Sequence, residues 1–371
     1  MIEESLSMRI AFFTLSMSMG GAERVISSLS EEYMKQGHEV MLITCFAADK
    51  EYLISEKIRK IQLDQKSLQN ERKIRRFIER RRSLQRAIKE YIPDVLICFL
   101  PEPCLLALSL KHSINCPIII SERCDPVTLY GHGIMSLIIK NMYNRADGCV
   151  FQTKEAQEYF DQQLQVKSCI IMNPLNPQFE REPYEGIREK EIVAVGRLHE
   201  QKNYPMLIKA FEKFQKEESE YHLTIYGEGN LQDELQNLIN TSGQEENITL
   251  YGLSDHICDS IYKASLFVMC SNYEGMPNAL LEAMAIGVPV VSTDCPCGGP
   301  RELILDRVNG RLIPLNDEDA LLSVFREMAH NHERYRGYSL EAAKIQEVAN
   351  AEKICQMWQR YVEQVLKEDK E

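Results

Sequence analysis

The sequence predicts an α/β protein made of two doubly wound domains, and three observations support this. Short apolar runs with strand character alternate with helical patterns along the 371 residues. Polar or glycine-containing turns follow the carboxyl ends of several of these runs. The alternation stops once, in a proline-rich stretch at residues 170–186, and then starts again. A chain of this length is sufficient for two domains of ordinary size.

The proline-rich stretch sets the predicted domain boundary. It contains Asn173-Pro174, Asn176-Pro177 and Pro183, and it has neither strand nor helix periodicity. We therefore expect residues 1–172 to form an N-terminal domain and residues 173–345 a C-terminal one. The chain ends in a long helical region with a predicted break near Ala349-Asn350, so residues 346–371 form a separate C-terminal helix in this prediction.

The first half carries polar groups where its strands end. Strand-like runs lie at 8–14, 38–44, 60–63, 93–100, 117–121 and 148–153, and a helix is expected over 154–164. Gly20-Gly21 follows the first run, where glycine lets the backbone approach a ligand closely. A tight turn without a ligand is the alternative, and no GxGxxG pattern supports NAD. Arg123 and Asp125 follow the fifth run, at the edge of a sheet where ligands collect.

The second half repeats the pattern, with strand-like runs at 191–195, 222–226, 248–252, 265–270 and 288–293. Arg197 and Lys202 lie together on the loop after its first strand, where both could neutralise a diphosphate. A helix-capping loop with surface charge is the alternative. Gly227 lies at the turn after the next strand.

The stretch Ser271–Gly287 has the most specific chemistry, because it carries two carboxylates, Glu274 and Glu282, eight residues apart. Pro277 suits a first helical turn, and the amides that follow it would form an anion site beside the positive end of the helix dipole. Glu282, one turn deeper, could bind a ribose. Together these groups describe a nucleotide-sugar pocket. An ordinary strand–loop–helix unit with two solvated glutamates remains the alternative.

A basic amphipathic helix is predicted over Arg72–Lys89. It holds nine basic residues and one acidic residue, with apolar side chains at helical spacing. A solvated helix packed on the domain is one interpretation. Contact with an anionic bilayer or a lipid diphosphate is another. Nucleic acid is disfavoured because the chain has a formal net charge of −12, divided as +2 over residues 1–172 and −14 over the rest.

The bulk sequence predicts an intracellular protein with reduced thiols. We see no signal peptide, and no apolar stretch reaches the roughly 18 residues of a membrane span. The 12 cysteines are scattered, and Cys295-Pro-Cys297 is interpreted as loop structure rather than as a metal site.

Taken together, these pieces resemble the GT-B retaining glycosyltransferases of family 4. The matching motifs are the Gly20-Gly21 turn, Gly196-Arg197 with Lys202, Gly227-Glu-Gly, the Glu274/Glu282 pair and Asn309-Gly310, and they cover nearly the whole chain. The chain looks most like bacterial members that extend polyprenyl-diphosphate-linked oligosaccharides. The resemblance implies two Rossmann-like domains facing a cleft, with the C-terminal helix crossing back to the N-terminal domain.

The resemblance also implies roles for the site residues. Glu274 would face the donor sugar, while Arg197 and Lys202 would hold its diphosphate, and these three form the expected catalytic set. Retention would follow a front-face displacement without a covalent intermediate, with no metal and no cofactor. The expected donor-binding residues are Gly20, Gly21, Gly227, Tyr251, Leu253, Gly275, Met276, Pro277, Asn278, Ala279, Leu280 and Glu282. The expected acceptor or sugar-positioning residues are Arg123, which stands where several relatives carry His, and Asp125, Lys73, Arg76 and Arg80.

The sequence therefore predicts transfer of a hexose or N-acetylhexosamine from a UDP-sugar to a lipid-diphosphate-linked oligosaccharide. We expect a cytoplasmic enzyme at the inner face of the cytoplasmic membrane, docked through the Arg72–Lys89 helix, with no nucleic-acid partner. Two alternatives stay open: the same fold acting on a soluble acceptor, and a non-catalytic protein that binds sugar nucleotides during assembly.

Overall fold

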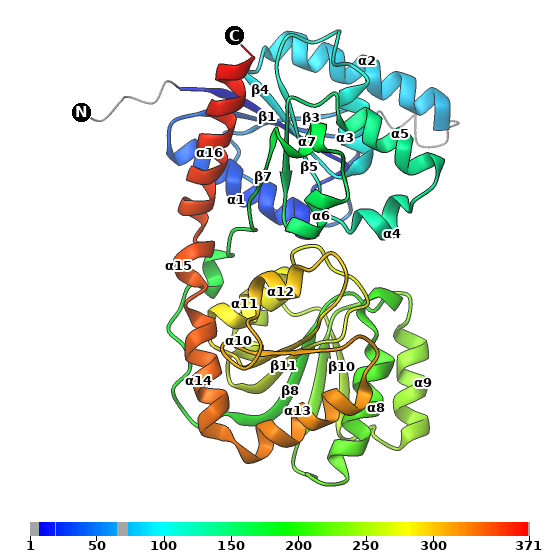
Figure 1. The fold of residues 1–371 in the computed structure, drawn as a ribbon, viewed down its shortest axis with the longest axis vertical. Coiled ribbons are helices and arrows are strands. Elements are labelled where there is room, and N and C mark those ends of the chain that lie inside the picture. Colours follow the sequence, from blue (N-terminus) through cyan, green and yellow to red (C-terminus); the bar gives the residue numbers. More distant parts are fainter. Residues whose placement is uncertain (1–6, 19, 65–72, 370–371) are drawn as a thin grey trace, which may run out of the picture. The chain divides into compact units, whose positions relative to one another are not determined.

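The computed structural model describes residues 7–18, 20–64 and 73–369, and the chain divides into two compact units (Figure 1). Unit 1 comprises residues 1–174 and 351–371, and unit 2 comprises residues 175–350. The chain thus passes between the units at Pro174–Leu175, inside the predicted irregular stretch, and again at Asn350–Ala351, at the predicted helix break.

Unit 1 contains a parallel sheet that has seven strands among the described residues, in the order β3-β2-β1-β4-β5-β6-β7. Strands β1 and β4, in the middle of the sheet, are apolar on both faces, as buried parallel strands require. Phe12 of β1 lies opposite Leu42 of β2 and Ile97 of β4. The strands are β1 (Arg9–Thr14), β2 (Glu39–Thr44), β3 (Arg59–Gln62), β4 (Val95–Phe99), β5 (Ile118–Ser121), β6 (Gly148–Phe151) and β7 (Ser168–Ile170).

Every helix of unit 1 buries at least one side chain. The first helix buries an apolar stripe of Val25, Ile26, Leu29 and Tyr33, at the spacing of a core-facing helix. The helix expected over 154–164 occurs as two short helices, because the buried ring of Phe160 lies between them and packs on neighbouring rings. The helices are α1 (Gly21–Lys35), α2 (Lys73–Tyr91), α3 (Pro101–Leu108), α4 (Pro126–Tyr130), α5 (Ile134–Tyr143), α6 (Lys154–Glu158) and α7 (Gln162–Gln165).

The C-terminal helix α16 (Ala351–Glu368) completes the core of unit 1, where it packs against α1 (Figure 1). Trp358 is fully buried and stacks on Phe99 of β4, with ring centroids 5.9 Å apart. The Tyr361 hydroxyl accepts the Cys149 N–H at 2.7 Å and donates to the Lys167 carbonyl at 2.6 Å. This helix therefore links the far end of the sequence to the central strands of unit 1.

Unit 2 contains a parallel sheet that has six strands among the described residues, in the order β10-β9-β8-β11-β12-β13. A cluster of aromatic rings, which includes Phe211, Phe214 and Phe325, packs α8 (Tyr204–Gln215) and α13 (Glu318–His330) together over this sheet. The strands are β8 (Glu189–Val195), β9 (His222–Tyr226), β10 (Ile248–Gly252), β11 (Ala264–Met269), β12 (Val290–Thr293) and β13 (Arg311–Ile313).

Most helices of unit 2 follow its strands along the chain, and three of them follow the last strand in succession. Two of them are single 3-10 turns, η2 (Pro177–Phe179) and η3 (Glu200–Lys202). The others are α8 (Tyr204–Gln215), α9 (Gln232–Ser242), α10 (Ile257–Tyr262), α11 (Asn278–Ala285), α12 (Gly299–Leu303), α13 (Glu318–His330), α14 (His332–Ala343) and α15 (Gln346–Ala349). None of the helices in the described ranges is both long enough and apolar enough to cross a bilayer.

The packing of α16 gives a first testable prediction. Trp358→Ala should lower the free energy of unfolding by about 3–5 kcal/mol, because it leaves a cavity against β4. Urea unfolding followed by circular dichroism measures this change. Met357→Ala, on the same helix but 40% exposed, is the control and should cost less than about 1 kcal/mol. Equal losses for both variants would contradict a core role for α16.

Candidate active site

The strand order of unit 2 places a ligand site at one position in the sheet. From β8 the chain proceeds outward through β9 and β10, and it then returns to the other side of β8 to form β11. The loops that leave β8 and β11 therefore separate at their carboxyl ends, and such a switch point is where open α/β sheets bind ligands. The first loop carries Arg197 and Lys202, and the second carries Glu274, so strand order brings together residues 72 or more positions apart.

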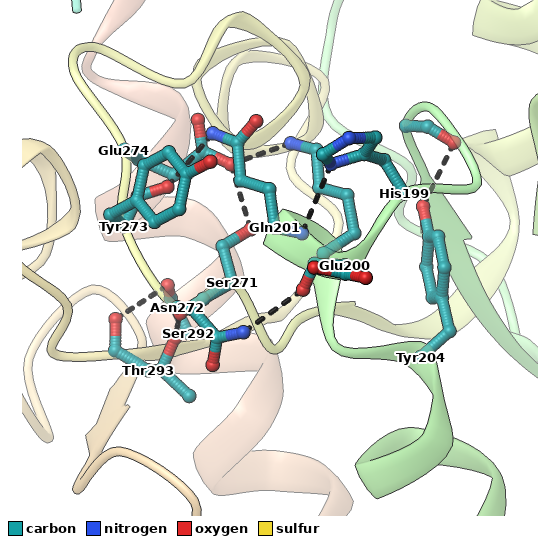
Figure 2. Close-up of polar contacts among 12 residues, drawn as sticks. His199, Glu200, Gln201, Tyr204, Ser271, Asn272, Tyr273, Glu274, Ser292 and Thr293 are labelled. Atoms are coloured by element: carbon teal, nitrogen blue, oxygen red, sulfur yellow. Dashed lines mark hydrogen bonds and ion pairs between the residues drawn. The ribbon is translucent and has the colours of Figure 1, made fainter. Parts of the chain in front are cut away.

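Backbone and amide hydrogen bonds connect these two loops (Figure 2). The Asn272 N–H donates to the Gln201 carbonyl at 2.7 Å, and the Asn272 side-chain amide donates to the Glu200 carbonyl at 2.9 Å. In the opposite direction, Gln201 Nε2 donates to the Tyr273 carbonyl at 2.9 Å. The two loops therefore form one connected structure around the switch point.

An ion pair joins the predicted catalytic side chains. Lys202 Nζ lies 2.6 Å from Glu274 Oε1, and the two side chains are only 15% and 10% exposed. Ser271 Oγ donates to the same carboxylate oxygen at 2.7 Å. The carboxylate thus receives two hydrogen bonds in a site largely shielded from water, where an unpaired charge would be strongly destabilising.

Neighbouring groups at the ion pair are kept neutral by burial. Burial raises the pKa of the Tyr204 hydroxyl, with a further contribution from the Glu274 charge, so this group stays a donor and bonds the Gly196 carbonyl at 2.9 Å. Burial raises the pKa of the Cys295 thiol to about 12, again with a contribution from Glu274. Lys202 and Glu274 therefore carry the charge at this position.

The loop after β12 supports the turn that carries Glu274. The Glu274 N–H donates to the Pro296 carbonyl at 3.1 Å. Thr293, the last residue of β12, donates its Oγ1 hydrogen to the Ser271 carbonyl at 2.6 Å (Figure 2). Cys295 and Cys297 are buried on this loop, consistent with the prediction that the pair is loop structure. A segment about 20 residues downstream thus fixes the backbone of the predicted catalytic carboxylate.

Gly299 at the start of α12 touches the same turn. A Cβ atom on this residue would lie 1.6 Å from the Gly275 carbonyl oxygen and 2.9 Å from Pro277 Cδ. Only glycine permits so close an approach between the two backbones. The Gly275 turn therefore depends on a glycine from another segment.

Helix α11 starts one residue later than predicted. Pro277 occupies the N-cap position, and the first intrahelical bond runs from the Leu281 N–H to the Pro277 carbonyl at 3.1 Å. The amides of Ala279 and Leu280 precede that bond, at the positive end of the helix dipole. Glu282 lies one turn deeper and is buried. The amides of Ala279 and Leu280 lie at the helix end where the sequence predicts an anion site, and the binding of an anion there stays a prediction.

Exposed apolar side chains border the switch point on its β10 side. Tyr251 and Leu253 are each 58% exposed, and the Tyr251 ring lies 5.0 Å from that of Tyr226. Gly227 must be glycine for packing reasons, because a Cβ atom there would lie 2.0 Å from the Gly196 carbonyl oxygen. Its predicted role as a donor contact is untested.

The cations predicted to bind ligands differ in their exposure to solvent and in their ion-pair partners. Arg197 is exposed at the end of β8. Lys73 is exposed and Arg76 is half-buried on the first turns of α2. Arg80 is 5% exposed and is bound by two carboxylates, Asp64 at 2.6 Å and Glu102 at 2.5 Å. The structure therefore gives Arg80 a role in stabilising unit 1, since its charge is already neutralised within the protein.

Arg123 and Asp125 lie at the end of β5. The Arg123 guanidinium packs over the rings of Phe99, 4.7 Å away, and Trp358, 5.8 Å away, and donates to Asn173 Oδ1 at 2.6 Å. Burial lowers the pKa of Arg123 to about 9. Asp125 caps α4 by accepting two amide hydrogen bonds. Both side chains thus have structural partners, and their predicted contact with a sugar stays a prediction.

The glycine turn of unit 1 lies at the corresponding position of its own sheet. The order β2-β1-β4 puts a switch point between β1 and β4. Gly20 is the N-cap of α1, and Gly21 is its first residue. A Cβ atom on Gly20 would lie 2.4 Å from Glu23 Oε2, so glycine leaves room for that carboxylate.

Comparison with known proteins identifies the family. Residues 178–345 match the family described as glycosyl transferases group 1, and residues 19–179 match glycosyltransferase family 4. The chain belongs to this glycosyltransferase family. It is 30% identical to a glycosyltransferase of Methanocaldococcus jannaschii over 63% of either chain, and so spans less than two thirds of that protein.

Another relative covers almost the whole chain. It is an α-1,4-N-acetyl-D-galactosaminyltransferase of Campylobacter jejuni, whose name gives a glycan linked to undecaprenol through a diphosphate. It is 27% identical over 91% of this chain and 93% of its own. Among solved structures, Anabaena HepE in complex with UDP and glucose matches with a TM-score of 0.82 and 16% identity, over 96% of this chain and 100% of that one. Sucrose-phosphate synthase from Thermosynechococcus elongatus matches with a TM-score of 0.84 and 17% identity, over 97% of this chain and 100% of that one. These structures share the GT-B fold with the chain.

Several residues of the candidate site were missed by sequence reasoning. Ser271, Gln201 and Asn272 bind the two loops together or hold Glu274, but as single polar residues on turns they gave no signal of their own. Only their adjacency to the predicted residues could have suggested them.

In the part of the chain that the structure describes, no three His, Cys, Asp or Glu side chains are grouped to hold a metal ion.

The Gly299 contact gives a second prediction. Gly299→Ala should lower the free energy of unfolding by about 1–3 kcal/mol, because the new methyl group overpacks the turn at Gly275. Urea unfolding measures the loss, and faster hydrogen exchange at the Glu274 amide would locate it. Gly337→Ala is the matched control, since a Cβ atom there meets nothing within 4 Å. If Gly299→Ala were as stable as Gly337→Ala, the contact would not support the turn.

Proposed function

We propose that the chain is a retaining, metal-independent glycosyltransferase of surface polysaccharide or glycan assembly. It transfers a hexose or N-acetylhexosamine from a UDP-sugar to a lipid-diphosphate-linked oligosaccharide. The observation that carries this proposal is the Lys202–Glu274 pair, buried at the switch point of unit 2 beside the amino end of α11. The family match and the lipid-linked acceptor named for the Campylobacter relative support it.

The donor fits the charges around this pair. Lys202, Arg197 and the first amides of α11 supply positive charge for a diphosphate, and Glu282 is placed one turn deeper for the ribose. The exposed Tyr251 ring offers a surface for the base. Once a diphosphate binds Lys202, Glu274 gains a hydrogen-bond capacity that can orient the sugar. UDP is proposed because HepE carries UDP in the same fold.

The transfer step assigns most of the catalysis to electrostatics. The bond from the sugar's anomeric carbon to the diphosphate oxygen breaks while the acceptor hydroxyl bonds that carbon on the same face. The hydroxyl proton passes to the departing diphosphate, which keeps both atoms and charge in balance. Lys202, Arg197 and the helix dipole stabilise the negative charge that develops on the leaving group. Because these groups are positioned before the reaction, little reorganisation is needed.

The acceptor is assigned to unit 1 by charge. The first two turns of α2 present Lys73, Arg75 and Arg76, cations suited to a lipid diphosphate or an anionic headgroup. Arg80 is left out of this set, because Asp64 and Glu102 already bind it. A peripheral position at the inner face of the cytoplasmic membrane follows from such an acceptor.

The catalytic assignment is tested by substitution. Glu274→Gln and Lys202→Met should each reduce transfer by about a hundredfold or more, because each removes a group that acts on the departing donor. The assay is a thermal-shift panel of UDP-, GDP- and ADP-sugars, followed by mass spectrometry of a lipid extract incubated with the sugar that binds. Glu333→Gln, an exposed carboxylate on α14, is the control and should transfer normally. Normal turnover of Glu274→Gln would refute the assignment.

Metal independence has its own test. EDTA should leave the transfer rate largely unchanged, because Lys202, Arg197 and the α11 amides supply the positive charge that a divalent cation provides elsewhere. Initial rates with and without EDTA measure this. A complete loss restored by Mg²⁺ or Mn²⁺ would contradict the proposal.

A further inference from the structure

Unit 1 exposes a set of large apolar side chains on two consecutive helices. On α5, Ile134 is 79% exposed and Leu137 is 68% exposed, while Ile139 and Tyr143 of the same helix are buried in the core. We call this exposed set the apolar face; its members are Val127, Leu129, Ile134, Met135, Leu137 and Ile138. So many large apolar side chains within 12 residues are unusual on the surface of a water-soluble monomer.

The helix α5, which carries most of the apolar face, shares a neighbour with the basic helix α2. Helix α5 contacts α3, and α3 contacts α2, so the two flank a common neighbour (Figure 1). The first turns of α2 expose Ile74, Phe77 and Ile78 among their basic residues. A groove of about 610 Å³ lies between α2 and α3, lined by Lys73, Ile74, Arg76, Phe77, Arg80, Pro101, Glu102 and Leu105. Apolar and cationic groups therefore alternate across this side of unit 1.

Topology puts these elements at one end of the unit 1 sheet. Helix α4 begins five residues after β5 ends, and α3 begins two residues after β4 ends. Helix α2 precedes β4, so its first turns lie at the same carboxyl edge. Ligands of doubly wound sheets bind at this edge. The apolar face is therefore near the place where unit 1 would receive an acceptor.

The charge around the apolar face indicates its partner. From Pro126 to Ala146 the sequence contains Lys140 and Arg145 but no Asp or Glu, in a chain with 55 acidic residues. Apolar side chains beside cations, with carboxylates absent, match the interface of an anionic bilayer. A second copy of the chain fits less well, because a two-fold contact here would bring the basic turns of two α2 helices together.

We propose that the apolar face inserts into the interface of an anionic membrane while the first two turns of α2 bind its headgroups. Electrostatic attraction by α2 alone would be weak in salt, and insertion by α4 and α5 makes the attachment resistant to it. This inference rests on the proposed function, since a lipid-linked acceptor presents its diphosphate at that interface.

The first test is flotation of the full chain with vesicles of phosphatidylethanolamine and phosphatidylglycerol. Ile134→Ser/Leu137→Ser should lower the partition coefficient by about tenfold or more per side chain, at both low and high salt. Lys73→Ser/Arg75→Ser/Arg76→Ser should lower it at low salt and have little further effect at high salt. The matched control is Leu53→Ser/Ile187→Ser, whose side chains are 92% and 95% exposed and lie outside the apolar face. Equal flotation of the apolar-face variant and this control would overturn the proposal.

A second measurement does not depend on loss of binding. The chain has one tryptophan, Trp358, which is fully buried. Fluorescence of Ile134→Trp should therefore shift to the blue on vesicles and be quenched by brominated lipids, while Trp358 in the unsubstituted chain stays unquenched. An unquenched Ile134→Trp would contradict insertion. So would ultracentrifugation showing that Ile134→Ser/Leu137→Ser turns a dimer into a monomer without changing flotation.

The outcomes separate this inference from the proposed function. Flotation needs no donor or acceptor, and transfer to a short-chain, water-soluble prenyl-diphosphate oligosaccharide needs no vesicles. If Ile134→Ser/Leu137→Ser transfers normally to that acceptor but no longer floats, both proposals are supported. If the unsubstituted chain transfers but does not float, only the membrane inference fails. If it floats but transfers to no acceptor, the proposed function fails.

Discussion

The buried ion pair between Lys202 and Glu274 is the interaction on which the organisation of unit 2 depends. Its two charges come from loops that follow β8 and β11, neighbours in the sheet only because the strand order reverses between them. Removing one partner of such a pair typically costs about 3–5 kcal/mol, because the other charge stays shielded from water without compensation. The Asn272 and Gln201 hydrogen bonds, together with the Gly275–Gly299 contact, keep the loops close enough for the pair to form.

The same pair explains how one site could be stable both without a donor and with a donor bound. Without a donor, Lys202 and Glu274 neutralise each other, so the site is stable when empty. In the proposed reaction a diphosphate would compete with Glu274 for Lys202, and Arg197 and the amides of α11 would attract it as well. The carboxylate then becomes available to the sugar it would orient. Because the backbone around Glu274 is fixed from three segments, this exchange needs movement of side chains only.

Local pattern was sufficient to predict most of the strands, though not β7 and β13, and the break at residues 170–186, since each depends on neighbours in sequence. Local pattern could not show which cations are left to bind a ligand and which are neutralised within the protein. Arg80 belongs to the same basic run as Arg76, yet contacts with Asp64 and Glu102, 16 and 22 residues away, bury and neutralise it. Asp125 caps α4 by accepting local amide hydrogen bonds, and its predicted contact with a sugar stays a prediction. Side-chain contacts between distant segments decided the case of Arg80.

The apolar face shows the same limit from the opposite direction. In the sequence, Ile134, Leu137 and Ile139 resemble any helix packed on a sheet, and periodicity cannot tell which side is covered. The structure buries Ile139 and leaves the other two in solvent. Exposing such side chains is unfavourable in water, and the free energy is recovered only if they are covered. A bilayer covers them without repelling the cations of α2, which is why the two features are best understood as parts of one surface.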